Sequence, residues 1–231
     1  MGLRFRLGLT LLASLVLAAC GRPLTPSEAA FLADLQGPAL DASAIRLHPD
    51  LAVGAPQVVP APPRLTCQSR IFPPSRGDRV RVHTGATAIF EDVFVRPDLY
   101  REDFVEGWPE VLPLADAMLL AHEAVHAWQW QNRALTGYHP LRAAFEHARS
   151  ADPYLFDIDT STDFLGYGFE QQGAIMEEYL CCRTLAPEAE RTGRLHAMLG
   201  EYFLLKDLDE PLTEAALLPW RGVEVEGICG P

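Results

Sequence analysis

The sequence predicts an α+β fold: one mostly helical domain in which a small antiparallel sheet precedes a central helix. Apolar residues recur every three or four positions from residue 114 to residue 128, which is the period of an amphipathic helix. Residues 79–96 are instead rich in β-branched and aromatic side chains, the pattern of short strands. The chain has 231 residues, of which 48% are apolar, so it can bury the core of one ordinary domain.

The first twenty residues predict the compartment. Arg4 and Arg6 precede an apolar run, residues 7–18, that is too short to span a bilayer comfortably. The run ends in Leu17-Ala18-Ala19-Cys20, which resembles a bacterial lipobox. This resemblance implies a lipoprotein signal peptide at 1–19, a lipid on Cys20 and, because Gly21 follows, the outer membrane of the cell envelope, facing the periplasm. An ordinary secretory peptide and an N-terminal membrane anchor are the alternatives.

Charge limits the partners. The formal net charge is −12, and removal of the basic start leaves the remainder more acidic still. An acidic body disfavours nucleic acid and also a polybasic attachment to anionic lipid. We therefore expect no nucleic-acid partner, and we expect membrane attachment through the lipid on Cys20.

The cysteines that follow Cys20 are Cys67, Cys181, Cys182 and Cys229. An envelope location permits disulfides, and an even number of cysteines suits them. Adjacent Cys181 and Cys182 are poor partners for each other, because a helical backbone holds their side chains apart. We expect Cys67 and Cys229 to join distant segments to a central helix, and the sequence does not choose between the two pairings that do so.

In the N-terminal half, residues 20–26 are expected to form a polar, lipidated stem, followed by a single domain over 27–231. A helix should begin near Pro26 and end before Gly37-Pro38. Frequent prolines over 49–76 predict an extended loop. Strands are expected at 80–83, 87–90 and 93–96, and the last of these could offer its edge to an extended peptide.

In the C-terminal half we expect mostly helices. The central helix should run from Pro113 to about Leu135, with Gly137 as its stop. A short helix is expected at 141–149, and longer ones at about 168–185 and 188–206. The tail after Pro211 should form one turn and then extend to Cys229.

The central helix carries the motif His122-Glu123-Ala124-Val125-His126. A spacing of four residues places both imidazoles on one face, one turn apart, where they can bind the same metal ion. Neutral imidazole nitrogen suits Zn²⁺, and a catalytic zinc site keeps one position open for water. Glu123 can then act as the base that takes a proton from that water. We expect one Zn²⁺, with His122 and His126 as ligands.

A third ligand is expected from the segment 166–179. Glu170 and Glu177 are seven residues apart and share one side of a helix. We expect Glu170, on the opening turn, to bind the metal and Glu177 to orient a ligand histidine from behind, with Glu177 or Glu178 as an alternative ligand. His139 and His147 are the rival donors, although each is more typical of a surface. The chain lacks the third histidine that metzincins carry shortly after the second.

The order of these segments resembles a group of largely uncharacterised bacterial zincin-like proteins, some of them encoded beside type VI secretion spike genes. The similar stretches are 40–48, 93–104, 120–129 and 167–175, within a region of about 25–185. This resemblance implies a zincin-like fold and supports Glu170, in a Glu-Gln-Gln element, as the third ligand, in the manner of gluzincin peptidases. The lipobox, the cysteines and the 49–76 insert depart from that group.

The expected function is therefore zinc-dependent hydrolysis, with a peptide or protein as substrate. Tyr138, Tyr167, Tyr179, His139 and Arg183 are unranked candidates to stabilise the oxyanion. The alternative is a non-catalytic metal-binding or scaffold lipoprotein with a degenerate zincin fold. Glu123 argues against it, because a purely structural zinc site has no use for a base. In a third hypothesis the motif is accidental and the disulfides hold the fold.

Overall fold

The computed structural model describes residues 21–230, apart from 52–55, 150–151, 158 and 160–161. The expected signal peptide and Cys20 lie outside the described residues. Within the described part of the chain, every helix is too short or too polar to cross a bilayer.

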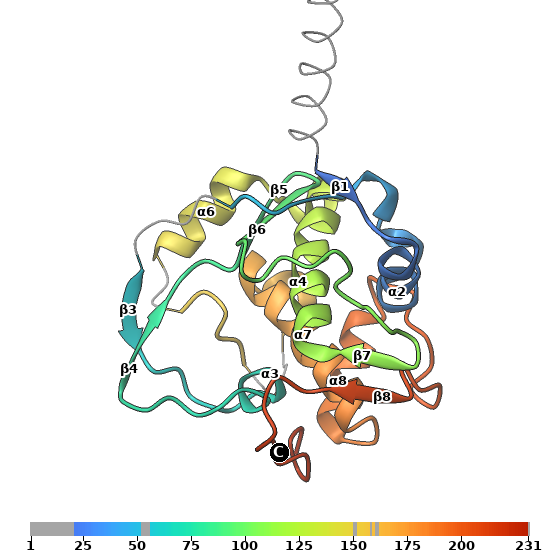
Figure 1. Cartoon of the computed structure of the whole chain (residues 1–231). Helices are drawn as coiled ribbons and strands as arrows, with labels where there is room; N and C mark the ends of the chain where they lie inside the picture. Colours follow the sequence, from blue (N-terminus) through green and yellow to red (C-terminus); the bar gives the residue numbers. More distant parts are fainter. Residues whose placement is uncertain (1–20, 52–55, 150–151, 158, 160–161, 231) are drawn as a thin grey trace, which may run out of the picture.

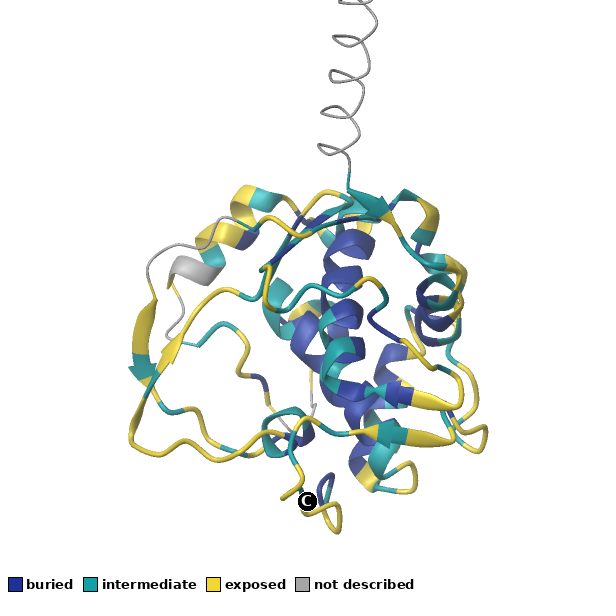
Figure 2. Ribbon diagram, viewed as in Figure 1, coloured by how far each residue is buried: buried dark blue, intermediate teal, exposed yellow. Residues whose placement is uncertain are grey.

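Two long helices form the centre of the molecule. α4 (Leu114–Gln131) packs along α7 (Phe169–Leu185), as Figure 1 shows. Figure 2 shows that buried residues dominate α4 and most of α7. α2 (Pro26–Gln36), α6 (Pro140–Arg149) and α8 (Glu190–Leu199) surround this pair. An apolar helix enclosed in this way can carry ionisable side chains only where they find partners.

A four-stranded sheet lies against α4. Its order is β1 (Arg22–Pro23), β2 (Arg46–His48), β6 (Asp92–Val95) and β5 (Ala86–Ile89). The predicted α+β class, with a small sheet before the central helix, is confirmed. The sheet is not wholly antiparallel, however, because β2 and β6 run parallel. β6 also has a neighbour on each side, so β1 and β5, and not the predicted 93–96 strand, are the edge strands of this sheet.

The prediction of an extended loop over 49–76 is wrong in part. β3 (Gln57–Pro60) pairs antiparallel with β4 (Arg79–Val82), and α3 (Cys67–Arg70) follows β3. Pro60 is tolerated because it lies at the end of a strand, and the Thr66 side chain caps α3. β4 therefore pairs with the proline-rich segment instead of the β5–β6 hairpin. The local pattern of apolar residues does not reveal this long-range pairing.

Helix boundaries follow the predictions except at two ends. α4 stops at Gln131, and Asn132 separates it from α5 (Arg133–Thr136), which Gly137 ends at φ 66°. α8 stops at Leu199, before Gly200, instead of near residue 206. The remaining elements are the 3₁₀ turns Gly37–Ala39, Ala42–Ala44 and Phe164–Gly166, and the parallel pair β7 (Val111–Pro113) and β8 (Ala215–Leu217).

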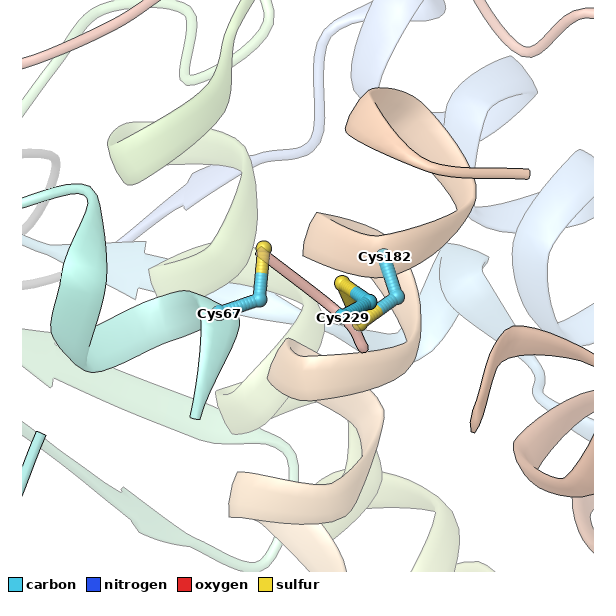
Figure 3. Close-up of side chains that lie close together, drawn as sticks. All are labelled: Cys67, Cys182 and Cys229. Carbon is cyan, nitrogen blue, oxygen red and sulfur yellow. A yellow bond between two sulfur atoms is a disulfide. The ribbon is translucent and has the colours of Figure 1, made fainter. Parts of the chain in front are cut away.

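Two disulfides meet on α7. Cys67 of α3 bonds to Cys181, and Cys229 of the C-terminal segment bonds to Cys182. Figure 3 shows Cys67, Cys182 and Cys229 gathered from these three segments. The expectation that Cys67 and Cys229 join distant segments to a central helix is confirmed. Since each of these three sulfurs belongs to a disulfide, their closeness marks two crosslinks and not a free thiolate site.

The expected polar stem is part of the folded domain. Arg22 and Pro23 form β1, which pairs with β2, and α2 already begins at Pro26. The Arg22 guanidinium donates to both carboxylate oxygens of Glu28, at 2.7 Å each, and Glu28 is fully buried. A buried, two-point ion pair holds its partners firmly. The chain is thus fixed to the domain from its first described residues.

Candidate metal centre

α4 presents the three side chains of its motif to one buried place. His122, Glu123 and His126 are each 5% exposed. The Nε2 atoms of the two histidines lie 3.2 Å apart, as a four-residue helical spacing allows.

Glu170 completes this group from the first turn of α7. Its Oε2 atom lies 3.3 Å from Nε2 of His122 and 3.4 Å from Nε2 of His126. The three donor atoms therefore form a nearly equilateral triangle. A tetrahedral zinc ion with bonds of about 2.0–2.1 Å requires its donor atoms to be about 3.3–3.4 Å apart. The residues present fit a metal ion of this kind and supply three of the four ligands that it takes.

A pair of buried glutamines orients His126. The amide nitrogen of Gln129 donates to the Phe169 carbonyl at 3.1 Å and to the Gln172 amide oxygen at 2.9 Å. Gln129 must then turn its amide oxygen to Nδ1 of His126, 2.9 Å away, and only a protonated Nδ1 can donate to it. Gln172 is itself held by the Tyr167 carbonyl. A neutral His126 consequently directs the lone pair of Nε2 toward Glu170 and His122.

Glu177 takes the corresponding place behind His122. Its Oε1 atom lies 3.2 Å from Nδ1 of His122, at ion-pair distance, although the two atoms are not aligned for a good hydrogen bond. With its side-chain amide turned so that both ends are satisfied, Gln68 donates to Oε2 of Glu177 at 2.6 Å and to the Ala174 carbonyl at 3.2 Å. The second residue of α3 thus supports the carboxylate that backs a candidate ligand.

The electrostatics of the group favour a cation. Burial acts to lower the pKa of His122, but the charges of Glu177 and Glu170 outweigh it and raise that pKa well above its usual value. The same balance, with Glu170 as the main charge, raises the pKa of His126. Burial opposes ionisation of Glu170, yet His126 and His122 hold the pKa of that carboxyl well below its usual range. Two lone pairs and a carboxylate converge here, and positive charge between them relieves their repulsion.

Glu123 is the buried acid that the group leaves unsatisfied. Its Oε2 atom is buried and has no hydrogen-bond partner among the described residues. Burial raises the pKa of this carboxyl, although His122 and His126 act against the shift. A carboxylate that lacks a partner beside a possible metal site is suited to accept a proton from water.

Gly173 allows α7 to approach His122. A Cβ atom at this position would lie 2.6–2.8 Å from three atoms of the imidazole ring, closer than side chains pack. The ring therefore occupies the space that any larger residue would fill. Glycine in the second turn of α7 therefore lets this helix lie close enough to His122 for Glu170 to reach it.

Two tyrosines stand beside the group. The Tyr138 ring is stacked with His126 at 6.2 Å between centroids, and the Tyr154 ring lies 5.9 Å from that of His122. Burial, aided by the charges of Glu170 and Glu123, raises the pKa of both phenols, so each stays protonated. Of the expected oxyanion donors, the structure places Tyr138 beside the metal ligands.

The Tyr167 hydroxyl is buried and has no hydrogen-bond partner among the described residues. The remaining expected residues are exposed, have other partners or are not described. Tyr179 bonds to His196 at 2.9 Å, and Arg183 donates to Tyr179 and to the Asp207 carbonyl. Glu178 is fully buried against Arg191 at 2.9 Å, so it is not an alternative ligand. His139 is exposed and accepts from the Leu141 amide. The side chain of His147 lies outside the described residues.

Sequence reasoning missed Gln129, Gln172, Gly173 and Tyr154 as parts of the site. Gln129 had a local signal, because it follows His126 by three residues on the same helical face. Tyr154 had none, since it reaches His122 from an irregular segment after α6.

A buried His-His-Glu group on two packed helices, with a glutamate beside it, defines the class of site as a candidate metal centre. Comparison with family models and with curated proteins finds no match. Among solved structures, the chain is similar to the effector domain of Pseudomonas aeruginosa VgrG2b, with 22% identity and a TM-score of 0.46 over 82% of this chain and 86% of that one. A likeness of this degree transfers no activity.

Proposed function

We propose that the protein is a zinc-dependent hydrolase, a peptidase, held in the bacterial cell envelope by a lipid on Cys20. The single observation that carries the catalytic part is the triangle of donor atoms from His122, His126 and Glu170, with sides of 3.2–3.4 Å. This size suits zinc, and the unpartnered Glu123 beside it suits catalysis better than a purely structural site.

The chain's own residues then have distinct tasks. A zinc ion held by His122, His126 and Glu170 would supply Lewis acidity toward water and a carbonyl group. Glu123 takes a proton from the attacking water and delivers it to the leaving amine. Tyr138, as a protonated phenol, offers a donor to the developing oxyanion. Gln129 and Glu177 hold the two imidazoles in the orientation that presents Nε2.

Replacement of Glu123 tests this assignment. The Glu123→Gln variant should keep one zinc ion per chain and lose turnover of casein or a peptide library by at least about a hundredfold. Glu190→Gln is the matched control, since Glu190 is an exposed acid on α8. Undiminished turnover in Glu123→Gln would remove Glu123 from the mechanism. A zinc-loaded wild type without turnover on any substrate tried would favour a metal-binding lipoprotein instead.

The anchor has its own test. Mass spectrometry of the mature protein should find the chain beginning at a lipid-modified Cys20. A Cys20→Ala protein should leave the membrane fraction. If that variant stays with the membrane as the wild type does, the lipid assignment is wrong.

A further inference from the structure

We propose that the domain lies directly against the bilayer through an apolar end, which we define as the β5–β6 turn, the last turn of α4, α5 and α6. This inference rests on the lipid anchor of the proposed function and not on its metal centre. The exposed or half-buried apolar side chains of this end are Ile89, Phe90, Trp130, Leu135, Leu141 and Phe145.

The first observation is the short distance along the chain between the anchor and the folded domain. Only Gly21 separates Cys20 from β1, and Gly21 is itself packed: a Cβ atom there would lie 2.5 Å from Nε2 of His48. Arg22 is then held by the buried Glu28 and donates to the Arg101 carbonyl at 2.9 Å. A lipid on Cys20 leaves almost no linker, so the part of the domain around β1 must touch the bilayer surface.

The second observation places the apolar end beside β1. Pro23 pairs with Arg46, Arg46 pairs with Asp92, and the Arg46 amide donates to the Glu91 carbonyl at 2.9 Å. The β5–β6 turn is therefore two strands from the start of the described chain. In Figure 1, β1, β5 and α6 lie together at the upper end of the molecule, whereas β8 and the C-terminus lie at the opposite end.

The third observation is an exposed aromatic stack on this turn. Phe90 has a φ of 62°, a left-handed conformation that bulky side chains rarely adopt. The centroids of the Phe90 and Trp130 rings lie 4.4 Å apart. The Arg133 guanidinium lies over the Trp130 indole, 4.4 Å from its centroid. Aromatic rings beside a cation are typical of side chains at the level of lipid headgroups.

The fourth observation is the outward face of α6. Leu141 and Phe145 are one turn apart and are 75% and 61% exposed. The opposite side of the helix packs inward, since Ala143 is buried and Glu146 accepts from the Phe169 amide. α6 is thus an amphipathic helix that presents its large apolar side chains to solvent, as helices at a membrane interface do.

Local charge agrees with a lipid surface. The whole chain carries a net charge of −12, but the segment 133–149 contains Arg133, Arg142 and Arg149 against Glu146 alone. Glu146 is occupied at the start of α7, and the Arg149 guanidinium lies over the Phe145 ring at 5.2 Å. Arginines around apolar side chains can extend toward anionic headgroups while their stems cover the apolar surface.

The test uses the full-length, lipid-modified protein in vesicles of phosphatidylethanolamine and phosphatidylglycerol that are brominated near the headgroup. Bromine quenches tryptophan fluorescence only at short range. Trp130→Phe should remove about half or more of the quenching seen in the wild type. Trp220→Phe, which changes a tryptophan just after β8 at the opposite end, should remove none. The double change Leu141→Asp and Phe145→Asp should reduce quenching, whereas Leu217→Asp on β8 should not.

Several results would overturn the proposal. One is equal loss of quenching in Trp130→Phe and Trp220→Phe, which means no preferred face. Another is a wild-type protein that stays in solution instead of binding to the vesicles, which would exclude the lipid anchor. A third is a wild-type dimer that Leu141→Asp with Phe145→Asp converts to a monomer, which assigns the surface to a second copy. Zinc content measured on the same samples separates these outcomes from failure of the catalytic proposal.

Discussion

Replacement of Gly173 by alanine should weaken zinc binding and should not bring the gain in stability that alanine usually brings to a helix. The added Cβ would lie 2.6 Å from Cε1, 2.7 Å from Nε2 and 2.8 Å from Nδ1 of His122. Carbon atoms in ordinary contact are about 3.5–4.0 Å apart, so the ring or α7 must move by nearly an ångström. Metal–ligand distances tolerate only about 0.2 Å.

The expected loss of zinc affinity is about 10- to 100-fold, which corresponds to about 1.4–2.8 kcal/mol. Gly193→Ala is the matched control, because Gly193 lies in α8 and a Cβ there meets nothing within 4 Å. Alanine in a helix interior is favoured over glycine by about 1 kcal/mol, so this control should gain stability and keep its zinc affinity. Competition with a chelator and thermal unfolding of the metal-free proteins measure the two quantities. A Gly173→Ala protein that binds zinc like the wild type and gains stability like the control would refute the reasoning.

Three further predictions concern the surroundings of the metal ligands. Gln129→Leu should lower zinc affinity by about tenfold and destabilise the metal-free protein by about 1–3 kcal/mol, because Gln172 and His126 lose a buried partner. Gln131→Leu, near the end of the same helix, is the control. Equal zinc affinities in the two variants would exclude the orienting role of Gln129. Carboxylates raise the pKa of His122 and His126, so protons compete with zinc for these side chains. Zinc affinity should therefore fall as the pH drops from about 8 to about 6, by about tenfold per pH unit for each histidine that must be deprotonated. Isothermal titration at several pH values measures this, and an affinity that does not change with pH would contradict it. Removal of Cys67–Cys181 by paired serine changes should reduce zinc affinity more than removal of Cys182–Cys229, because α3 carries the Gln68 that holds Glu177. Either loss should cost about 2–5 kcal/mol of stability. Equal zinc affinities in the two variants would show that α3 does not support the metal centre.

The parts of the site that follow from helical periodicity could be predicted from the sequence. His122, Glu123 and His126 share a face by spacing alone, and Glu170 and Glu177 share one by the same rule on a second helix. The pairing of those two helices was not in the pattern, but it followed once a metal was assumed to need a third ligand. Glu178 shows the limit of the rule. It directly follows Glu177 in α7, yet its carboxylate pairs with Arg191 and not with the metal ligands.

What the sequence did not reveal depends on contacts between distant segments. Gln172 binds Gln129 across 43 residues, and β3 pairs with β4 across the proline-rich segment. Neither contact alters the local pattern of apolar residues, from which strands and helices are predicted. The sequence predicts a polar stem after Cys20, whereas the buried ion pair of Arg22 with Glu28 fixes this segment to the domain.

The most direct test of the central claim is anomalous X-ray scattering at the zinc edge from crystals of the zinc-saturated protein. We expect one strong peak that is about 2.0–2.2 Å from Nε2 of His122, Nε2 of His126 and Oε2 of Glu170 together. A zinc peak elsewhere, or no peak between these three atoms at full saturation, would contradict the metal centre and the function proposed from it.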